Sequence, residues 1–106
     1  MDLNKDETLV HEEGGSYFKD FVAIGGQITL TTQRILFSSN RKDSACPTME
    51  IPLSEIDKVD YFKTLNVIPN GLMLMLTNGS IDSFVVDDRV EWKNRIVGLL
   101  ESRLSV

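Results

Sequence analysis

The stretch Gly25-Gly26-Gln27-Ile28-Thr29-Leu30-Thr31-Thr32-Gln33-Arg34-Ile35-Leu36-Phe37 decides the fold of this chain. Ile28 and Leu30 alternate with threonines. After a polar break, Ile35 and Phe37 repeat the same two-residue period. Apolar side chains two residues apart lie on one face of a strand, and threonine favours strands over helices. The stretch therefore predicts two short antiparallel strands joined by a tight turn.

The chain before this stretch contains two further apolar segments. Residues 8–12 predict a short strand, and residues 17–24 form a second apolar run. Pairs of glycines, Gly14-Gly15 and Gly25-Gly26, stand at either end of the second run and are typical of turns or bends. One long bent strand and two short strands both fit this pattern.

The chain after residue 37 continues the series of short strands. Residues 39–48 are polar and lack periodicity, which predicts a loop. Residues 49–52 predict a short strand ended by proline, residues 53–56 one helical or 3₁₀ turn, and residues 57–64 another strand. Pro69-Asn70-Gly71 is typical of a β-turn.

Asn78-Gly79 between two apolar runs is the strongest hairpin signal, because both residues of a type I′ turn adopt positive φ. A two-residue turn here would place Phe84 on the opposite face from Leu72 and Leu74. Either both faces of the hairpin are covered, or a bulge near residues 82–83 turns Phe84 inward. We favour the bulge.

The chain ends in a predicted amphipathic helix. Asp88 and Glu91 have the spacing of a capping box, which places the start of the helix there. The apolar residues that fall on one stripe of this helix are Trp92, Ile96, Leu99 and Leu100. Gly98 inside the helix predicts close backbone packing at that point.

Length and composition predict one globular domain. The chain has 106 residues, of which 42% are hydrophobic and 25% charged. We expect residues 1–7 to be a flexible N-terminus and residues 8–106 to form the domain. The first residues lack the basic and apolar regions of a signal peptide, and no run approaches the roughly 20 apolar residues of a membrane span. The single cysteine, Cys46, excludes an internal disulfide and fits the cytoplasm as the expected location.

Charge and residue types exclude several classes of function. The net charge of −5 argues against a nucleic-acid partner, because phosphate binding requires a basic stripe. His11 is the only histidine, and no nucleophile stands beside a base, so the sequence predicts no enzyme, no metal site and no cofactor. The carboxylates of residues 87, 88 and 91 fit helix capping better than acid–base chemistry.

The string Gly26-x-Ile28-x-Leu30-Thr31-x-x-Arg34-Ile35-Leu36-Phe37 resembles the opening motif of GRAM domains, which belong to the pleckstrin-homology (PH)-like superfold. The resemblance continues through Ile51-Pro52-Leu53, Pro69-Asn70-Gly71-Leu72 and Asp88-Arg89-x-Glu91-Trp92, and covers roughly residues 8–103. It implies two nearly orthogonal antiparallel sheets that form a partly open barrel of about seven strands. It also implies a C-terminal helix that caps the barrel and plants Trp92 in its mouth, and binding of lipid head groups or protein segments.

Two candidate binding surfaces follow. Lys19, Arg41 and Lys42 are candidate lipid-binding or anion-binding residues, the last two in the 39–48 loop. The resemblance implies cations on the second strand of a phosphoinositide binder, where this chain has the neutral Gln27 and Thr29.

The second surface depends on the alternation in residues 72–76. If the leucines of this run face the core, Met73 and Met75 face outward and form a candidate partner surface. We therefore expect a non-catalytic cytoplasmic adaptor that acts through protein–protein interaction or self-association. The alternative is weak binding of a phosphoinositide or another anionic lipid through the 39–48 loop, at the periphery of a membrane.

Overall fold

The computed structural model describes residues 3–19, 22–39, 48–64 and 68–104, which form a mainly β domain with one helix at its end. In chain order, the elements are β1 (Leu9–Lys19), β2 (Val22–Thr31), β3 (Arg34–Ser39), β4 (Thr48–Pro52), a 3₁₀ turn (Leu53–Glu55), β5 (Ile56–Thr64), β6 (Ile68–Leu76), β7 (Ile81–Val85) and α1 (Arg89–Leu104). This confirms the predicted fold class, the β2–β3 hairpin, the strand that ends at proline and the terminal helix.

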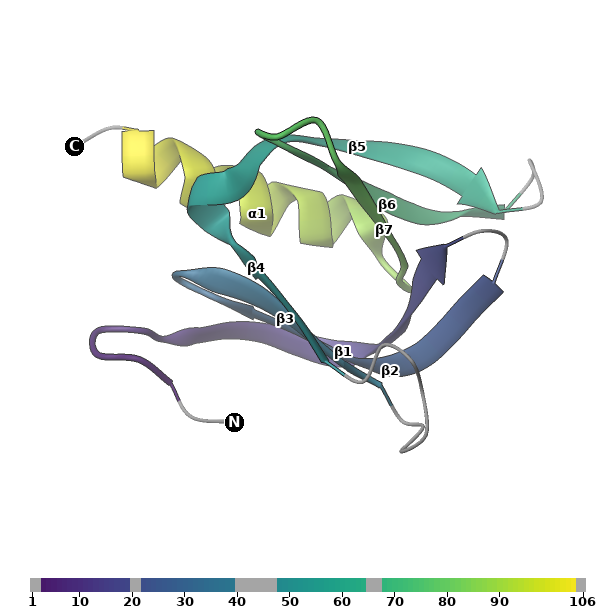
Figure 1. Cartoon of the computed structure of the whole chain (residues 1–106), viewed down its shortest axis with the longest axis horizontal. Coiled ribbons are helices and arrows are strands. Elements are labelled where there is room, and N and C mark those ends of the chain that lie inside the picture. Colours follow the sequence, from purple (N-terminus) through teal and green to yellow (C-terminus); the bar gives the residue numbers. More distant parts are fainter. Residues whose placement is uncertain (1–2, 20–21, 40–47, 65–67, 105–106) are drawn as a thin grey trace.

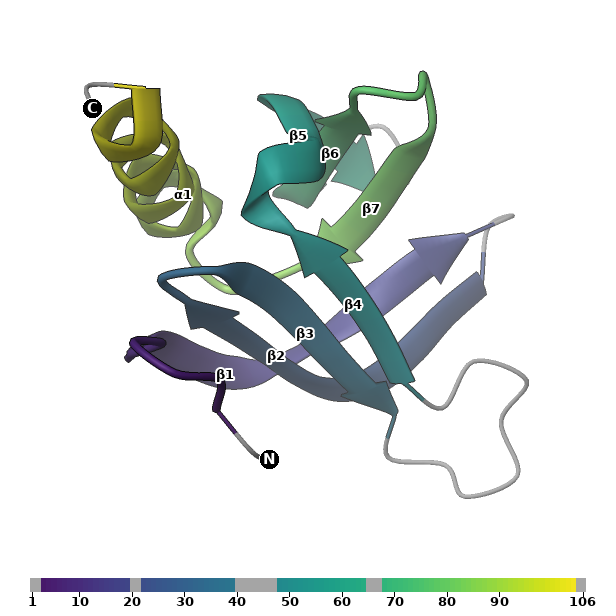
Figure 2. The same ribbon diagram turned by 60° about the vertical axis from the view of Figure 1, so that its left-hand side comes forward.

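The seven strands form one antiparallel sheet in the order β4-β3-β2-β1-β7-β6-β5. The strand β1 pairs with β2 on one side and, over Ser16–Phe18, with β7 on the other. The two sheets that the resemblance implied are therefore halves of one sheet, which folds over on itself as Figures 1 and 2 show. In the described residues β4 and β5 form the two edges and do not pair, so the barrel is open. The helix α1 packs against β5 and β6 at one end of the open barrel (Figure 2).

The glycine pairs lie inside strands, so of the predicted turns or bends they mark bends and not turns. The strand β1 runs unbroken through Gly14 and Gly15, and Gly15 pairs with Gly26 of β2. A Cβ on Gly26 would lie 2.2 Å from the carbonyl oxygen of Ser38, and one on Gly15 would lie 2.7 Å from that of Val85. Backbones approach this closely only where a side chain is absent. The glycines thus allow the sheet to fold where its two halves meet.

The predicted turn at Pro69-Asn70-Gly71 is also wrong, because β6 already begins at Ile68. Gly71 pairs with Phe62 of β5, and a Cβ on Gly71 would lie 2.5 Å from Cδ1 of the Phe62 ring. In the described part of the chain, Gly79 is the only glycine with a positive φ. Gly71 therefore makes room for an aromatic ring and does not supply a turn conformation.

The β6–β7 hairpin has a longer turn than predicted. The amide of Leu76 donates to the carbonyl of Ser80 at 2.8 Å, and the loop between them ends on Gly79 with φ of 90°. This extra residue shifts the register by one, so that Phe84 pairs with Leu72 and both are buried. Three-residue hairpin loops with a left-handed last residue are common. The predicted bulge near residues 82–83 is therefore wrong, since the turn itself resets the alternation.

The core lies between the two halves of the sheet and under α1. Its buried side chains are Tyr17, Ile28, Leu30, Ile35, Phe37, Ile51, Leu53, Ile56, Val59, Leu72, Leu74, Phe84, Val86, Trp92 and Ile96. Both strands of the opening stretch contribute to this cluster, as their period predicts.

The helix α1 closes the barrel through its first turns. Asp88 accepts a hydrogen bond from the amide of Glu91 at 3.0 Å, which confirms the predicted helix start. The indole N–H of Trp92 donates to Glu13 on β1. The ring of His11 packs edge-on against the indole, with 4.9 Å between the ring centroids. Gly98 is exposed, and a Cβ there would meet nothing within 4 Å, so the close packing predicted at this residue is wrong.

Candidate binding surfaces

The outer surface of β5–β7 is set by the alternation of β6. Leu72 and Leu74 are 2% and 0% exposed and face the core. Met73 and Met75 therefore face outward, where each is partly buried. Paired residues on neighbouring strands point to the same side of a sheet, so the register identifies the other residues of this surface.

Six apolar side chains share this surface, which we call the methionine face: Phe18, Phe62, Met73, Met75, Ile81 and Val85. The rings of Phe18 and Phe62 lie 5.6 Å apart between centroids, and Ile81 is 54% exposed. The helix α1 lies on the other side of β5–β7 (Figures 1 and 2). The other five side chains are partly buried. An apolar outer face of this kind is typical of interaction sites.

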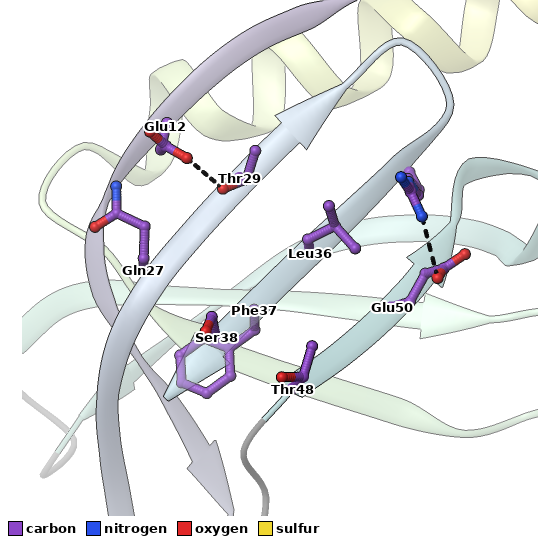
Figure 3. A pocket seen from close by; sticks show the side chains of 9 residues that line it. Glu12, Gln27, Thr29, Leu36, Phe37, Ser38, Thr48 and Glu50 are labelled. Atoms are coloured by element: carbon purple, nitrogen blue, oxygen red, sulfur yellow. Dashed lines mark hydrogen bonds and ion pairs between the residues drawn. The ribbon is translucent and has the colours of Figure 1, made fainter. Parts of the chain in front are cut away.

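The outer surface of the other half of the sheet carries a groove of about 550 Å³. Its lining residues are Glu12, Gln27, Thr29, Arg34, Leu36, Phe37, Ser38, Thr48 and Glu50, which come from β1 to β4. Figure 3 shows Leu36 in the middle, with the polar side chains around it. The hydroxyl of Thr29 donates to Glu12 at 2.8 Å. Gln27 and Thr29 thus contribute neutral side chains to a groove that holds two carboxylates.

Arg34 is the cation of this groove, and carboxylates of the same chain already bind it. Its Nε and Nη2 donate to the two oxygens of Glu7 at 2.8 and 3.1 Å. Its Nη1 lies 3.2 Å from Glu50. Such bidentate pairs are the strongest that arginine makes, and the ion pair raises the pKa of Arg34 above its ordinary value. The groove is therefore acidic in sum and disfavours an anionic ligand.

Glu7 is the residue that the sequence analysis missed. Its side chain is fully buried at the end of the β2–β3 hairpin, where Thr31 and the amide of Asn4 also donate to it. The hydrogen bond from Arg34, assisted by those from Thr31 and Asn4, lowers the pKa of Glu7 to about 2, against the opposing effect of burial. No local pattern marks Glu7, because its partner lies 27 residues away in the chain.

The side chains of the candidate cations lie outside the part of the chain that the structure describes. Lys19 is the last residue of β1, but its side chain lies outside what the structure describes. Arg41 and Lys42 also lie outside the described residues, as does Cys46. The structure thus brings Met73 and Met75 together with four further apolar residues. No helix in the described part of the chain is long and apolar enough to cross a membrane.

The model of the GRAM domain matches residues 1–91. This chain belongs to the GRAM domain family. Domains of this kind bind lipids or proteins and are generally not catalytic. No curated protein matched the sequence of this GRAM domain.

Solved structures show the same fold. The Vps36 N-terminal PH domain has a TM-score of 0.77 and 20% identity, over 98% of this GRAM domain and 86% of that chain. The C-terminal domain of an unknown protein from Leishmania infantum has a TM-score of 0.75 and 14% identity, over 91% and 86%. The human ARAP2 N-terminal PH domain has a TM-score of 0.68 and 17% identity, over 88% and 80%. At these identities the likeness shows the fold alone, which is PH-like.

Proposed function

We propose that this GRAM domain is a non-catalytic cytoplasmic adaptor that binds protein through the methionine face, and that the partner is a second copy of the chain. The observation that carries the proposal is the set of six apolar side chains on the outer surface of β5–β7. Methionine side chains adapt their shape to a facing surface, which suits them to an interface.

The charges beside the methionine face support a second copy as the occupant. Lys58 and Asp60 stand two residues apart on β5 and pair with Met75 and Met73 respectively. In a two-fold symmetric dimer the same surface of each copy forms the contact, so that a contact from one residue to another is repeated in the opposite direction. A two-fold axis that passes between Lys58 and Asp60 sets Lys58 of one copy against Asp60 of the other, and this pairing of opposite charges would fix the register of the apolar contact.

Lipid binding is the competing function. The neutral Gln27 and Thr29 and the carboxylates of the groove weigh against an anionic head group on the outer surface of β1–β4. We retain a separate candidate set for binding a lipid or another anion at the membrane periphery, which consists of Lys19, Arg41 and Lys42.

The decisive experiment measures molar mass by light scattering after size-exclusion chromatography, over a range of protein concentrations. We expect a dimer that the exchange Met75→Glu converts to a monomer, because a charge would be buried in the apolar contact. The control is Val90→Thr, which alters an exposed apolar residue of α1, outside the methionine face, and leaves the dimer intact. A wild-type protein that stays monomeric at every concentration contradicts self-association.

Charge reversal tests the two-fold arrangement. Lys58→Asp alone sets like charges against each other across the dimer and weakens it. The double variant Lys58→Asp/Asp60→Lys restores opposite charges, and with them the association. Failure of the double variant to restore it excludes this register.

Vesicle sedimentation on the same samples tests the alternative. Binding to anionic vesicles that falls with salt and disappears in Arg41→Glu/Lys42→Glu would favour the lipid-binding function.

A further inference from the structure

Two cations converge on one aromatic ring where β5 meets α1. The guanidinium carbon of Arg89 lies 4.4 Å from the centroid of the Tyr61 ring, and Nζ of Lys93 lies 4.7 Å from it. The Nη1 of Arg89 also donates to the carbonyl of Phe62 at 3.0 Å, which fixes the position of the guanidinium. Both cations are partly buried, since α1 packs against β5.

No described carboxylate forms an ion pair with Arg89 or Lys93. The nearby acidic side chains have other partners, since Asp88 caps α1 and Glu91 pairs with Arg95 at 2.7 Å. The contrast with Arg34 is informative, because two glutamates bind that guanidinium. Lys58 and Lys63 also form no ion pair in the described residues, but Arg89 and Lys93 differ from them in that both lie against one aromatic ring.

Three further properties of this place favour an anion. Arg89 is the first residue of α1, where the helix dipole is positive and disfavours a cation. The two cations also repel each other across one ring. The hydroxyl of Tyr61 has no hydrogen-bond partner in the described residues and can donate to an oxygen atom. A bound anion would therefore offset both unfavourable interactions and accept a hydrogen bond from the phenol.

We propose that Arg89, Lys93 and Tyr61 form a binding site for a phosphate monoester. The charge of such a group, about −1.5 to −2 at neutral pH, matches two cations, whereas a carboxylate would neutralise only one. Its oxygens accept from the guanidinium, the ammonium and the phenol together. This site is separate from the methionine face and does not depend on the proposed function.

The test is a titration of the full chain followed by NMR, with glycerol 3-phosphate as the soluble probe. We expect saturable shifts at the Tyr61 ring and the Arg89 side chain. Arg89→Gln and Lys93→Gln each weaken binding about tenfold, because each removes one charge-assisted hydrogen bond. Tyr61→Phe weakens it less. Lys93→Gln keeps the test valid if Arg89→Gln unfolds the chain, since the ammonium of Lys93 forms no ion pair within the described residues and lies against the ring.

Controls separate this site from general ionic effects and identify the source of the phosphate. Arg95→Gln removes an exposed cation of the same helix and leaves the affinity unchanged. Methyl sulfate, a monoanion, binds more weakly. Equal binding of methyl sulfate, an equal loss in Arg95→Gln, or no saturable shift overturns the proposal. Vesicles with phosphatidic acid, compared with vesicles of phosphatidylserine, show whether the monoester is presented by a lipid. Retention on the former alone assigns a lipid source, and binding of glycerol 3-phosphate alone assigns a soluble one.

Discussion

The outer surfaces of the two halves of the sheet differ in whether their side chains find partners within the same chain. On β1–β4, Thr29 donates to Glu12, and Arg34 binds Glu7 and Glu50. On β5–β7, the methionine face presents apolar side chains that no described helix covers. Both surfaces are made by strands with the same two-residue period. The difference shows that a strand pattern fixes which residues point outward. Contacts with other segments decide whether those outward side chains already have partners or stay free to bind another molecule.

Both halves of the sheet pack on one core. An exchange that disrupts the core should therefore destabilise both outer surfaces together. Trp92→Ala deletes the indole that α1 inserts between the halves and that donates to Glu13. We expect the free energy of unfolding to fall by about 3–5 kcal/mol. Urea unfolding followed by circular dichroism measures the loss.

The control for this exchange is Val90→Ala, which truncates a 52% exposed residue of the same helix and should cost at most about 0.5 kcal/mol. Equal effects of the two exchanges would mean that α1 does not hold the halves together.

The ion pair of Glu7 makes the surface of β1–β4 sensitive to acid. The pKa of Glu7 is lowered from 4.5 to about 2 in the folded chain, chiefly by the hydrogen bond from Arg34. A lowered folded-state pKa means that the stabilisation is fully present above pH 4.5 and is lost as the pH falls toward 2. Glu7→Gln should therefore lower the stability at neutral pH and flatten the pH dependence in this window. Urea unfolding at a series of pH values measures both effects.

An exchange on the other surface supplies the comparison. Met75→Thr should leave the acid dependence of the wild type unchanged, because it does not touch the Glu7 pair. A wild-type profile as flat as that of Glu7→Gln would show that the pair does not contribute to folding.

The smallest effect on folding is expected on the methionine face. Met75→Thr places a residue that favours strands at an outward position of β6, so the stability of the monomer should change by no more than about 0.5 kcal/mol. Unfolding is measured at a concentration where the proposed dimer has dissociated. A loss as large as that of Trp92→Ala would mean that Met75 belongs to the core and that the two surfaces do not differ as described.

Local patterns predicted most of the fold. The period of Ile28, Leu30, Ile35 and Phe37 identified the β2–β3 hairpin, and all four side chains are buried. The spacing of Asp88 and Glu91 identified the start of α1. These features involve residues close together in the chain, so their physical cause is visible in the sequence.

Most of the errors in the strands have one cause, which is contact between segments that are distant in the chain. The sequence pattern placed Gly26 at a turn or bend and Gly71 in a turn, but each faces an aromatic ring and a carbonyl group on a neighbouring strand. The β6–β7 turn was taken as two residues long because Asn78-Gly79 is typical of such turns. Burial of Phe84 opposite Leu72 required one residue more.

The methionine face was likewise predicted in part from the sequence and completed only by the tertiary structure. Alternation alone identified Met73 and Met75 as outward residues. The pairing of β5 and β7 with β6, and of β1 with β7, added Phe18, Phe62, Ile81 and Val85 to that face, because register decides which residues share a surface.

The sequence by itself determined the strand and helix periods, the family motif and the absence of cations at Gln27 and Thr29. Only the tertiary structure decided which charges are neutralised. Arg34 meets Glu7 across 27 residues of chain, and Arg89 and Lys93 meet Tyr61 at the contact between α1 and β5. Electrostatic partners are set by distance in space, and the folded sheet brings together residues that the order of the chain keeps apart.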